Sequence, residues 1–177
     1  MGLLTPKIVT SYGQRPPRCE LQDNPLGPDS TVFIHYSASD GAGIDKRGEP
    51  RQAVLNIQAH HQDGNGWCDT GYSWIVVQPR GIFKRPIVFK GRGFGKVPAA
   101  QEGHNTGNVA ICVIADSNDR ISRATFRAIA YLVRRCPARN VKGHRDVNST
   151  SCPGDRLYSK LDELRRIARE PKAGRLP

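Results

Sequence analysis

Seven consecutive apolar residues, Val109 to Ala115, constrain the fold more than any other segment. An uninterrupted apolar run of this length, without polar alternation, predicts a central strand covered on both faces. The shorter β-branched and aromatic run from Thr31 to Ile34 predicts a second buried strand, which ends at His35. No run approaches the roughly 18 apolar residues of a membrane helix, so we do not expect a membrane span.

Three helices and a hairpin complete the predicted pattern. Pro50, followed by apolar residues at helical spacing, predicts a helix at about 50–62. Segments 72–77 and 82–83 flank the turn signal at 78–81 and predict a hairpin. Ser122 is expected to cap a helix that ends at Pro137 and has an inward stripe of Phe126, Ile129, Ala130 and Val133. The last predicted helix follows Pro153, with Leu157, Leu161, Leu164 and Ala168 inward.

The order of these elements predicts an α/β fold with a mixed central β-sheet and helices on both faces. The length of 177 residues suits one such domain. Residues 1–30 are rich in proline and glycine and are expected to form an irregular N-terminal arm. We therefore place the domain at 31–170 and a short C-terminal tail at 171–177.

The formal net charge of +11 is distributed unevenly. The first 119 residues carry 12 basic and 11 acidic side chains, whereas residues 120–177 carry 15 basic and 5 acidic ones. Most of this excess lies on the two C-terminal helices. Such a surface favours binding to nucleic acid, to an anionic membrane surface or to the phosphate-rich polymers of a bacterial envelope. The alternative is that the charge only aids solubility.

The five cysteines are widely spaced and form no CxxC pair. An odd number leaves at least one thiol free or metal-bound, which predicts folding in a reducing compartment rather than a disulfide scaffold. The N-terminus lacks the charged and apolar regions of a secretory signal. We therefore expect synthesis in the cytoplasm, with any export by another route.

The segment from Gly143 to Gly154 places His144 and Cys152 eight residues apart, in a loop that opens a helix. A helix N-terminus favours a thiolate, and zinc accepts imidazole and thiolate ligands. His35, after the first buried strand, is the best third candidate. Three ligands with water in the fourth position are typical of catalytic zinc. The alternative is that His35 is an ordinary buried polar residue and Cys152 a small hydrophobe.

Four motifs in order carry a family resemblance: residues 33–39 (FIHYSAS), 66–72 (GWCDTGY), 103–105 (GHN) and 143–154 (GHRDVNSTSCPG). Over about residues 30–168 the chain resembles the zinc-dependent N-acetylmuramoyl-L-alanine amidases of type 2. That family includes T7 lysozyme and the peptidoglycan recognition proteins. The resemblance implies an α/β amidase fold with one Zn²⁺ in a surface cleft.

The resemblance also implies roles for individual residues. His35, His144 and Cys152 match the zinc ligands, and Tyr72 and Thr150 match catalytic positions that stabilise the oxyanion. Candidate substrate-binding residues are Trp67, His104 and Asn105, with packing as the alternative for Trp67 and helix capping as the alternative for Thr150. Ser73 and Ala100 depart from the residues that the family often has at these positions, which affects the expected shape of the pocket.

The implied activity is hydrolysis of the amide between N-acetylmuramic acid and L-alanine of peptidoglycan. Together with the charge and the absent signal, it predicts a bacteriophage endolysin that is made in the host cytoplasm and acts on the cell wall after release. We expect a monomer that binds peptidoglycan and, through its basic C-terminal helices, anionic wall polymers. The alternatives are a non-catalytic peptidoglycan-binding protein and a basic protein that binds a polymerase or nucleic acid.

Overall fold

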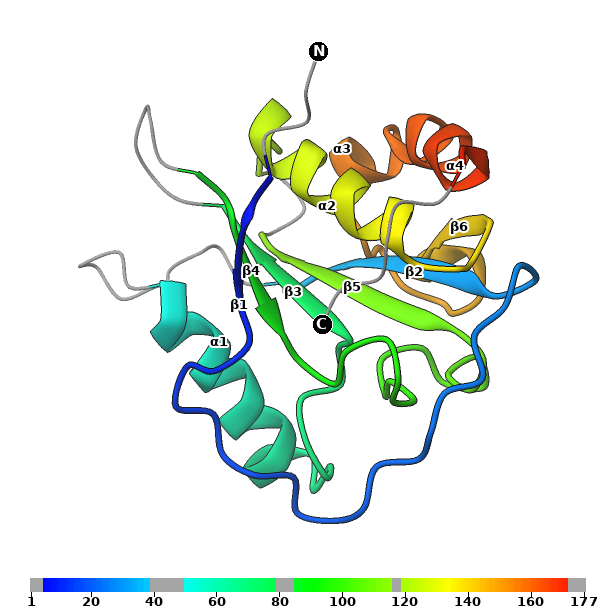
Figure 1. The fold of residues 1–177 in the computed structure, drawn as a ribbon. Coiled ribbons are helices and arrows are strands. Elements are labelled where there is room, and N and C mark those ends of the chain that lie inside the picture. Colours follow the sequence, from blue (N-terminus) through cyan, green and yellow to red (C-terminus); the bar gives the residue numbers. More distant parts are fainter. Residues whose placement is uncertain (1–4, 39–49, 79–84, 116–118, 172–177) are drawn as a thin grey trace.

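A six-stranded mixed sheet organises the molecule (Figure 1). The computed structural model describes residues 5–38, 50–78, 85–115 and 119–171. The strand order is β1-β4-β3-β5-β2-β6. The strands are β1 (Lys7–Val9), β2 (Thr31–Tyr36), β3 (Trp74–Val77), β4 (Ile87–Lys90), β5 (Val109–Ile114) and β6 (Asn140–Gly143).

The apolar run forms β5, which lies between β3 and β2 and is buried along its whole length. It pairs in parallel with both neighbours. β6 is parallel to β2, and β1 is parallel to β4. The antiparallel pair is β3 with β4, which makes the sheet mixed as predicted.

Helices cover both faces of this sheet (Figure 1). Alternate residues of β5 point to opposite faces, so Ile111 joins one core cluster and Cys112 the other. Residues of α2 (Arg123–Arg135), α3 (Asp155–Tyr158) and α4 (Leu161–Arg169) pack into the first cluster. Residues of α1 (Pro50–Ala59) pack into the second. This arrangement confirms the predicted fold class.

The helix boundaries agree with the sequence in part. Ser122 caps α2, because its hydroxyl accepts a hydrogen bond from the Thr125 backbone N–H. The first helix is α-helical to Ala59 and continues as a π-helical turn, η1 (His60–Gly64). The predicted last helix is two helices, α3 and α4, although its four inward residues are buried as expected. Every helix among the described residues is too short or too polar to span a membrane.

Two strands of the sheet differ from the pattern expected from the sequence. The strand expected at 82–83 and most of its turn lie outside the described residues, and β4, at 87–90, is the strand that pairs with β3. The sequence analysis also missed β6, a short strand whose exposed and buried residues alternate. Its side chains at the edge of the sheet gave no apolar run to detect.

The N-terminal arm is more ordered than its composition suggested. It contributes the edge strand β1 to the sheet. Arg15 and Arg18 form salt bridges with Asp63 at the end of η1. Cys19 forms a disulfide with Cys68, 49 residues away, a pairing that the spacing of the cysteines did not predict. Cys112, Cys136 and Cys152 are buried and form no disulfide with any described residue.

Candidate functional site

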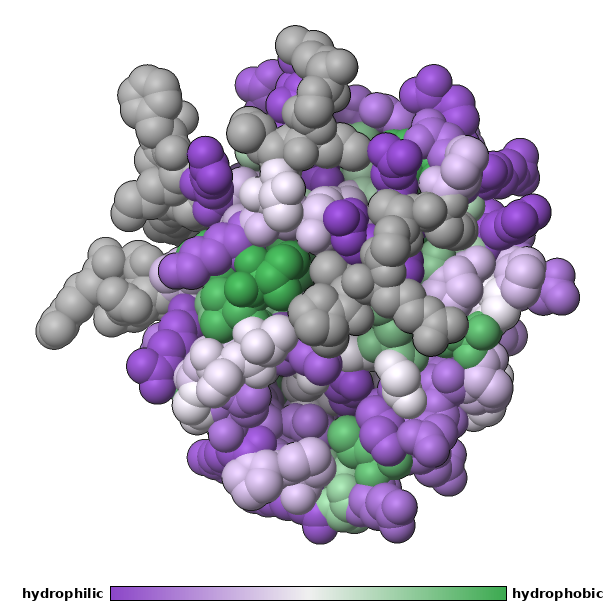
Figure 2. Space-filling view, viewed as in Figure 1, coloured by the Kyte–Doolittle hydropathy of each residue, from purple (hydrophilic) through white to green (hydrophobic). Residues whose placement is uncertain are grey.

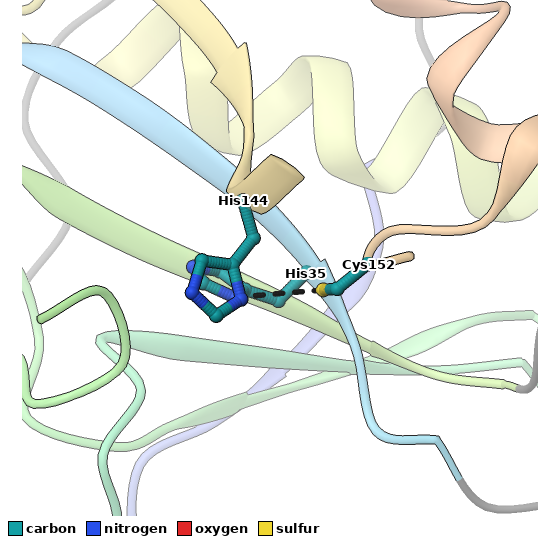
Figure 3. Close-up of side chains that lie close together, drawn as sticks. All are labelled: His35, His144 and Cys152. Atoms are coloured by element: carbon teal, nitrogen blue, oxygen red, sulfur yellow. Dashed lines mark hydrogen bonds between the residues drawn. The ribbon is translucent and has the colours of Figure 1, made fainter. Parts of the chain in front are cut away.

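Parallel pairing of β2 with β6 brings two histidines to the same edge of the sheet. Ile34 of β2 pairs with Gly143 of β6, so His35 and His144 are the next residues of the two strands. His144 opens a short 3-10 turn, η2 (His144–Asp146), and Cys152 lies in the loop before α3. The ligand atoms of the three residues lie within 4.8 Å of one another. Figure 3 shows the three side chains converging from these segments.

Close packing holds the segments that carry His144 and Cys152 together. A Cβ at Gly143 would lie 2.9 Å from Pro153, so only glycine permits β6 to approach the cysteine loop this closely. The Arg145 backbone N–H donates to the Cys152 carbonyl (2.9 Å), and the Arg145 guanidinium donates to Asp155 and to the Ser151 carbonyl. These contacts fix the loop around Cys152.

His35 is held by a residue that the sequence analysis did not identify, Gln101. The Gln101 Nε2 donates to the His104 carbonyl (3.2 Å), which accepts only, so Gln101 Oε1 faces His35 as an acceptor. His35 Nε2, at 3.1 Å, must then carry the hydrogen. His35 Nδ1 is left with a lone pair and faces Cys152 Sγ at 3.7 Å (Figure 3). This is the tautomer that a metal ligand needs.

Burial keeps both histidines neutral. Desolvation, helped by the nearby His144, lowers the pKa of His35 to about 3, against an opposing hydrogen bond to Gln101. Desolvation also lowers the pKa of His144, against an opposing interaction with Asn148. Neutral imidazoles with free lone pairs are competent metal ligands at neutral pH.

The environment of Cys152 corrects one expectation. We expected the helix N-terminus to favour a thiolate, but α3 has only four residues, and burial raises the pKa of Cys152 to about 11. The backbone N–H of Tyr36 and the charge of Arg145 oppose this shift without overcoming it. A buried thiol of this kind deprotonates when a cation binds it directly. Two imidazoles and one thiol form a donor set that suits zinc.

The two predicted catalytic residues lie on separate segments beside this cluster. The ring of Tyr72, in the segment before β3, is 5.6 Å from the ring of His35. Burial raises the pKa of Tyr72 well above 10, with smaller contributions from Cys112 and Cys152. Thr150 is exposed, and its Oγ1 accepts a hydrogen bond from the Cys152 backbone N–H (3.2 Å).

The three predicted substrate-binding residues lie around the cluster and make structural contacts. Trp67 is half-buried and packs on His61, with ring centroids 4.7 Å apart. His104 is exposed, and its carbonyl holds Gln101. Asn105 Oδ1 accepts hydrogen bonds from the backbone N–H groups of Ala100 and Gln101 (both 3.1 Å).

His60 and His61, adjacent residues in the π-helical turn η1, face different surroundings. His61 is buried and its Nδ1 accepts from the Gly71 backbone N–H (2.9 Å), whereas His60 is exposed. Both line a cavity of about 210 Å³ together with Tyr72 and Asn56. The cavity therefore adjoins the histidine and cysteine cluster through Tyr72.

Comparison with known proteins supplies independent information. No protein-family model matches the chain. Peptidoglycan recognition protein 1 of Bos taurus is 30% identical over 141 residues, which cover 74% of this chain and 70% of the bovine protein. N-acetylmuramoyl-L-alanine amidase of Homo sapiens is 30% identical over 159 residues, which cover 85% of this chain but 26% of the human protein.

A solved structure agrees with these sequence relatives. It contains tracheal cytotoxin bound to the ectodomain complex of peptidoglycan recognition proteins LCa and LCx, and it is 27% identical to this chain. The TM-score is 0.73, and the alignment covers 89% of this chain and 95% of the other. The sequence identity to the bovine protein and the shared fold lead to one conclusion: the chain belongs to the peptidoglycan recognition protein family.

Proposed function

We propose that the protein is a zinc-dependent N-acetylmuramoyl-L-alanine amidase, which hydrolyses the amide between N-acetylmuramic acid and L-alanine of peptidoglycan. The observation that carries the proposal is the convergence of His35, His144 and Cys152 within 4.8 Å beside Tyr72. One relative is named as an amidase of this specificity, and a structural relative holds tracheal cytotoxin. Both facts support peptidoglycan as the substrate.

The residues present fit a catalytic zinc ion. They offer three ligand atoms, and the hydrogen bond that His35 Nε2 donates to Gln101 leaves the lone pair of His35 Nδ1 facing the shared centre. Three protein ligands leave one coordination position for substrate or water. When bound, zinc would supply Lewis acidity toward the scissile carbonyl.

Tyr72 and Thr150 are the groups of this chain that we assign to the developing oxyanion. The raised pKa of Tyr72 keeps its hydroxyl protonated at neutral pH, so that it donates a hydrogen bond. Thr150 Oγ1 already accepts from the Cys152 backbone, which leaves the hydroxyl hydrogen available to donate. Two neutral donors would favour negative charge on the carbonyl oxygen as it develops.

The cavity next to Tyr72 is the proposed position of the first residues of the stem peptide. Its lining combines the apolar side chains of Ala53, Ile57 and Ile114 with polar groups from Ser37, Asn56 and His60. A peptide has both kinds of surface, so this lining suits it. Trp67, His104 and Asn105 remain candidates for further contacts with the substrate.

We further propose that the enzyme acts as a phage endolysin, made in the host cytoplasm and released to the wall. The Cys19–Cys68 disulfide supports action in an oxidising compartment, since disulfides persist there. The net charge of +11 supports retention by anionic wall polymers. Expression in the bacterial cytoplasm should leave cells intact until the membrane is permeabilised, after which they should lyse. Lysis without permeabilisation would contradict this role.

The deciding experiment is mass spectrometry of purified peptidoglycan after digestion, with and without a strong zinc chelator. New free L-alanine amino termini beside intact glycan strands, abolished by chelator and restored by zinc, would support the amidase. New reducing sugar ends would mean a glycosidase. Cleavage should also be lost in Cys152→Ser but kept in Cys136→Ser, a matched change at another buried cysteine that lies outside the site. Peptidoglycan binding without cleavage would place the protein among non-catalytic recognition proteins.

A further inference from the structure

A groove on the helical face opposite α1 has no role in the proposed reaction. It lies between α2 on one side and α3 and α4 on the other, which run beside each other above the sheet in Figure 1. Its volume is about 780 Å³. None of the ligand, catalytic or substrate-binding candidates lines it, so it is a separate feature of the surface.

The rim of the groove is strongly cationic. Five basic side chains line it, and Glu163 is the acidic one among the lining residues. The basic residues are Arg120, Arg123, Arg127, Arg156 and Lys160. Figure 2 shows hydrophilic side chains projecting from the surface over the C-terminal helices. Like charges gathered in this way attract an anion of matching size.

Unlike two other basic residues of the same helices, these five cations have no acidic partner among the described residues. Arg134 pairs with Glu170, and Arg165 pairs with Asp162. None of the five rim cations forms a salt bridge with any residue that the structure describes. Their charge is therefore available to a ligand rather than used within the protein.

The floor of the groove is apolar, which narrows the chemistry of the ligand. Ile121, Phe126 and Ile167 line it and are only partly buried against the core. A nucleic acid or a wall phosphate polymer would satisfy the rim and leave these side chains in water. A phospholipid offers both parts, because its phosphate matches the cations and its acyl chains match the floor.

We propose that this groove docks the protein on an anionic phospholipid bilayer, with headgroup phosphates at the rim and the upper acyl region against Phe126. Docking there needs no peptidoglycan and no metal, because the groove contains none of the site residues. It would hold the enzyme at a bacterial membrane independently of its activity. The proposal therefore stands or falls separately from the amidase assignment.

Co-sedimentation of the full chain with vesicles tests the proposal. At physiological ionic strength the protein should bind phosphatidylcholine vesicles that contain phosphatidylglycerol, and not vesicles of phosphatidylcholine alone. The triple variant Arg123→Gln, Arg127→Gln, Lys160→Gln should bind about 100-fold more weakly, since each cation near an anionic surface contributes several-fold.

The matched control is Arg139→Gln, Arg166→Gln, Arg169→Gln, which removes the same charge from exposed residues outside the groove. It should bind within a few-fold of the native protein, because screening limits distant charges. An equal loss of vesicle binding in both triple variants would contradict docking at the groove. It would show that binding depends on net charge alone. Circular dichroism of each variant checks that the helices remain folded.

A third variant tests the apolar floor. In Phe126→Trp, the added indole fluorescence should shift to the blue on vesicle binding, relative to the native protein. An unchanged emission wavelength in the vesicle-bound variant would contradict contact between residue 126 and the acyl region. Binding to soluble polyglycerol phosphate, with no binding to vesicles, would assign the groove to a wall polymer instead.

Discussion

Replacement of Gln101 by methionine should weaken zinc binding without disturbing any ligand. Methionine keeps the approximate volume of glutamine but has no oxygen to accept from His35 Nε2. The site is fully buried at both residues, so water cannot replace the lost acceptor. The tautomer of His35 that binds metal carries its hydrogen on Nε2. In the variant this buried Nε2–H would have no acceptor.

The magnitude follows from the two hydrogen bonds that Gln101 makes. Loss of its amide donor is compensated, since the His104 carbonyl also accepts from Asn108 Nδ2 (3.0 Å). Loss of its acceptor at His35 is not compensated and costs about 1–3 kcal/mol. The metal-free protein escapes part of this cost, because the ring proton can move to Nδ1 and donate to Cys152 Sγ. In the zinc-bound protein the ring proton cannot move, because Nδ1 holds the metal. The affinity for zinc should therefore fall roughly 10- to 100-fold.

Competition with a chromophoric chelator at fixed pH measures this change. Gln101→Glu restores an acceptor and should bind zinc at least as tightly as the native protein. Glu102→Gln, at the exposed neighbouring position, should have no effect. A dissociation constant for Gln101→Met within about twofold of the native value would refute the argument. So would an equal loss of stability in the metal-free protein, because the change would then act on the fold rather than on the ligand.

Three other outcomes follow from the structure. Tyr72→Phe should keep zinc affinity but lower turnover by about 10²-fold or more, measured on a soluble muropeptide; unchanged turnover would remove Tyr72 from the mechanism. Burial, with the charges of His60 and Arg92, lowers the pKa of His61 from 6.5 to about 4, so its stabilising contribution is complete above pH 6.5. That contribution, up to about 3 kcal/mol, should be lost as the pH falls toward 4, and urea unfolding of His61→Gln should lack this part of the pH dependence. Reduction of Cys19–Cys68, which closes a 49-residue separation, should lower the free energy of unfolding by about 2–4 kcal/mol; an unchanged denaturation midpoint would contradict this.

The strongest sequence signals predicted the core of the fold correctly. The run from Val109 to Ala115 is apolar because β5 is covered on both faces, and no other environment tolerates it so well. Ser122 was recognisable as a cap because its hydroxyl makes a local contact three residues away. The edge strands β1 and β6 were not recognisable, since an edge strand buries too little to require an apolar pattern.

The sequence predicted those site residues whose side chains have a specific chemistry and belong to recognisable motifs. The proposed ligands His35, His144 and Cys152 belong to motifs with a specific order, and the structure brings them together. Gln101 carries no such signal, because its role depends on a loop that turns back toward β2. The Cys19–Cys68 pairing was hidden for the same reason, since the two residues meet only after the arm crosses the end of η1. Long-range contacts of this kind follow from the fold and not from spacing.

Backbone pairing and hydrogen bonds within the loop position the three residues that would hold the metal. β2 and β6 place the two histidines through backbone pairing, and Arg145 places Cys152 through hydrogen bonds to its own loop. Under the proposed function, zinc would bind donors that the fold itself positions, so part of its binding free energy would go to affinity rather than to folding. Small zinc domains that fold only with their metal differ in this respect, and we expect the replacement of a single buried amide such as Gln101 to change zinc affinity measurably.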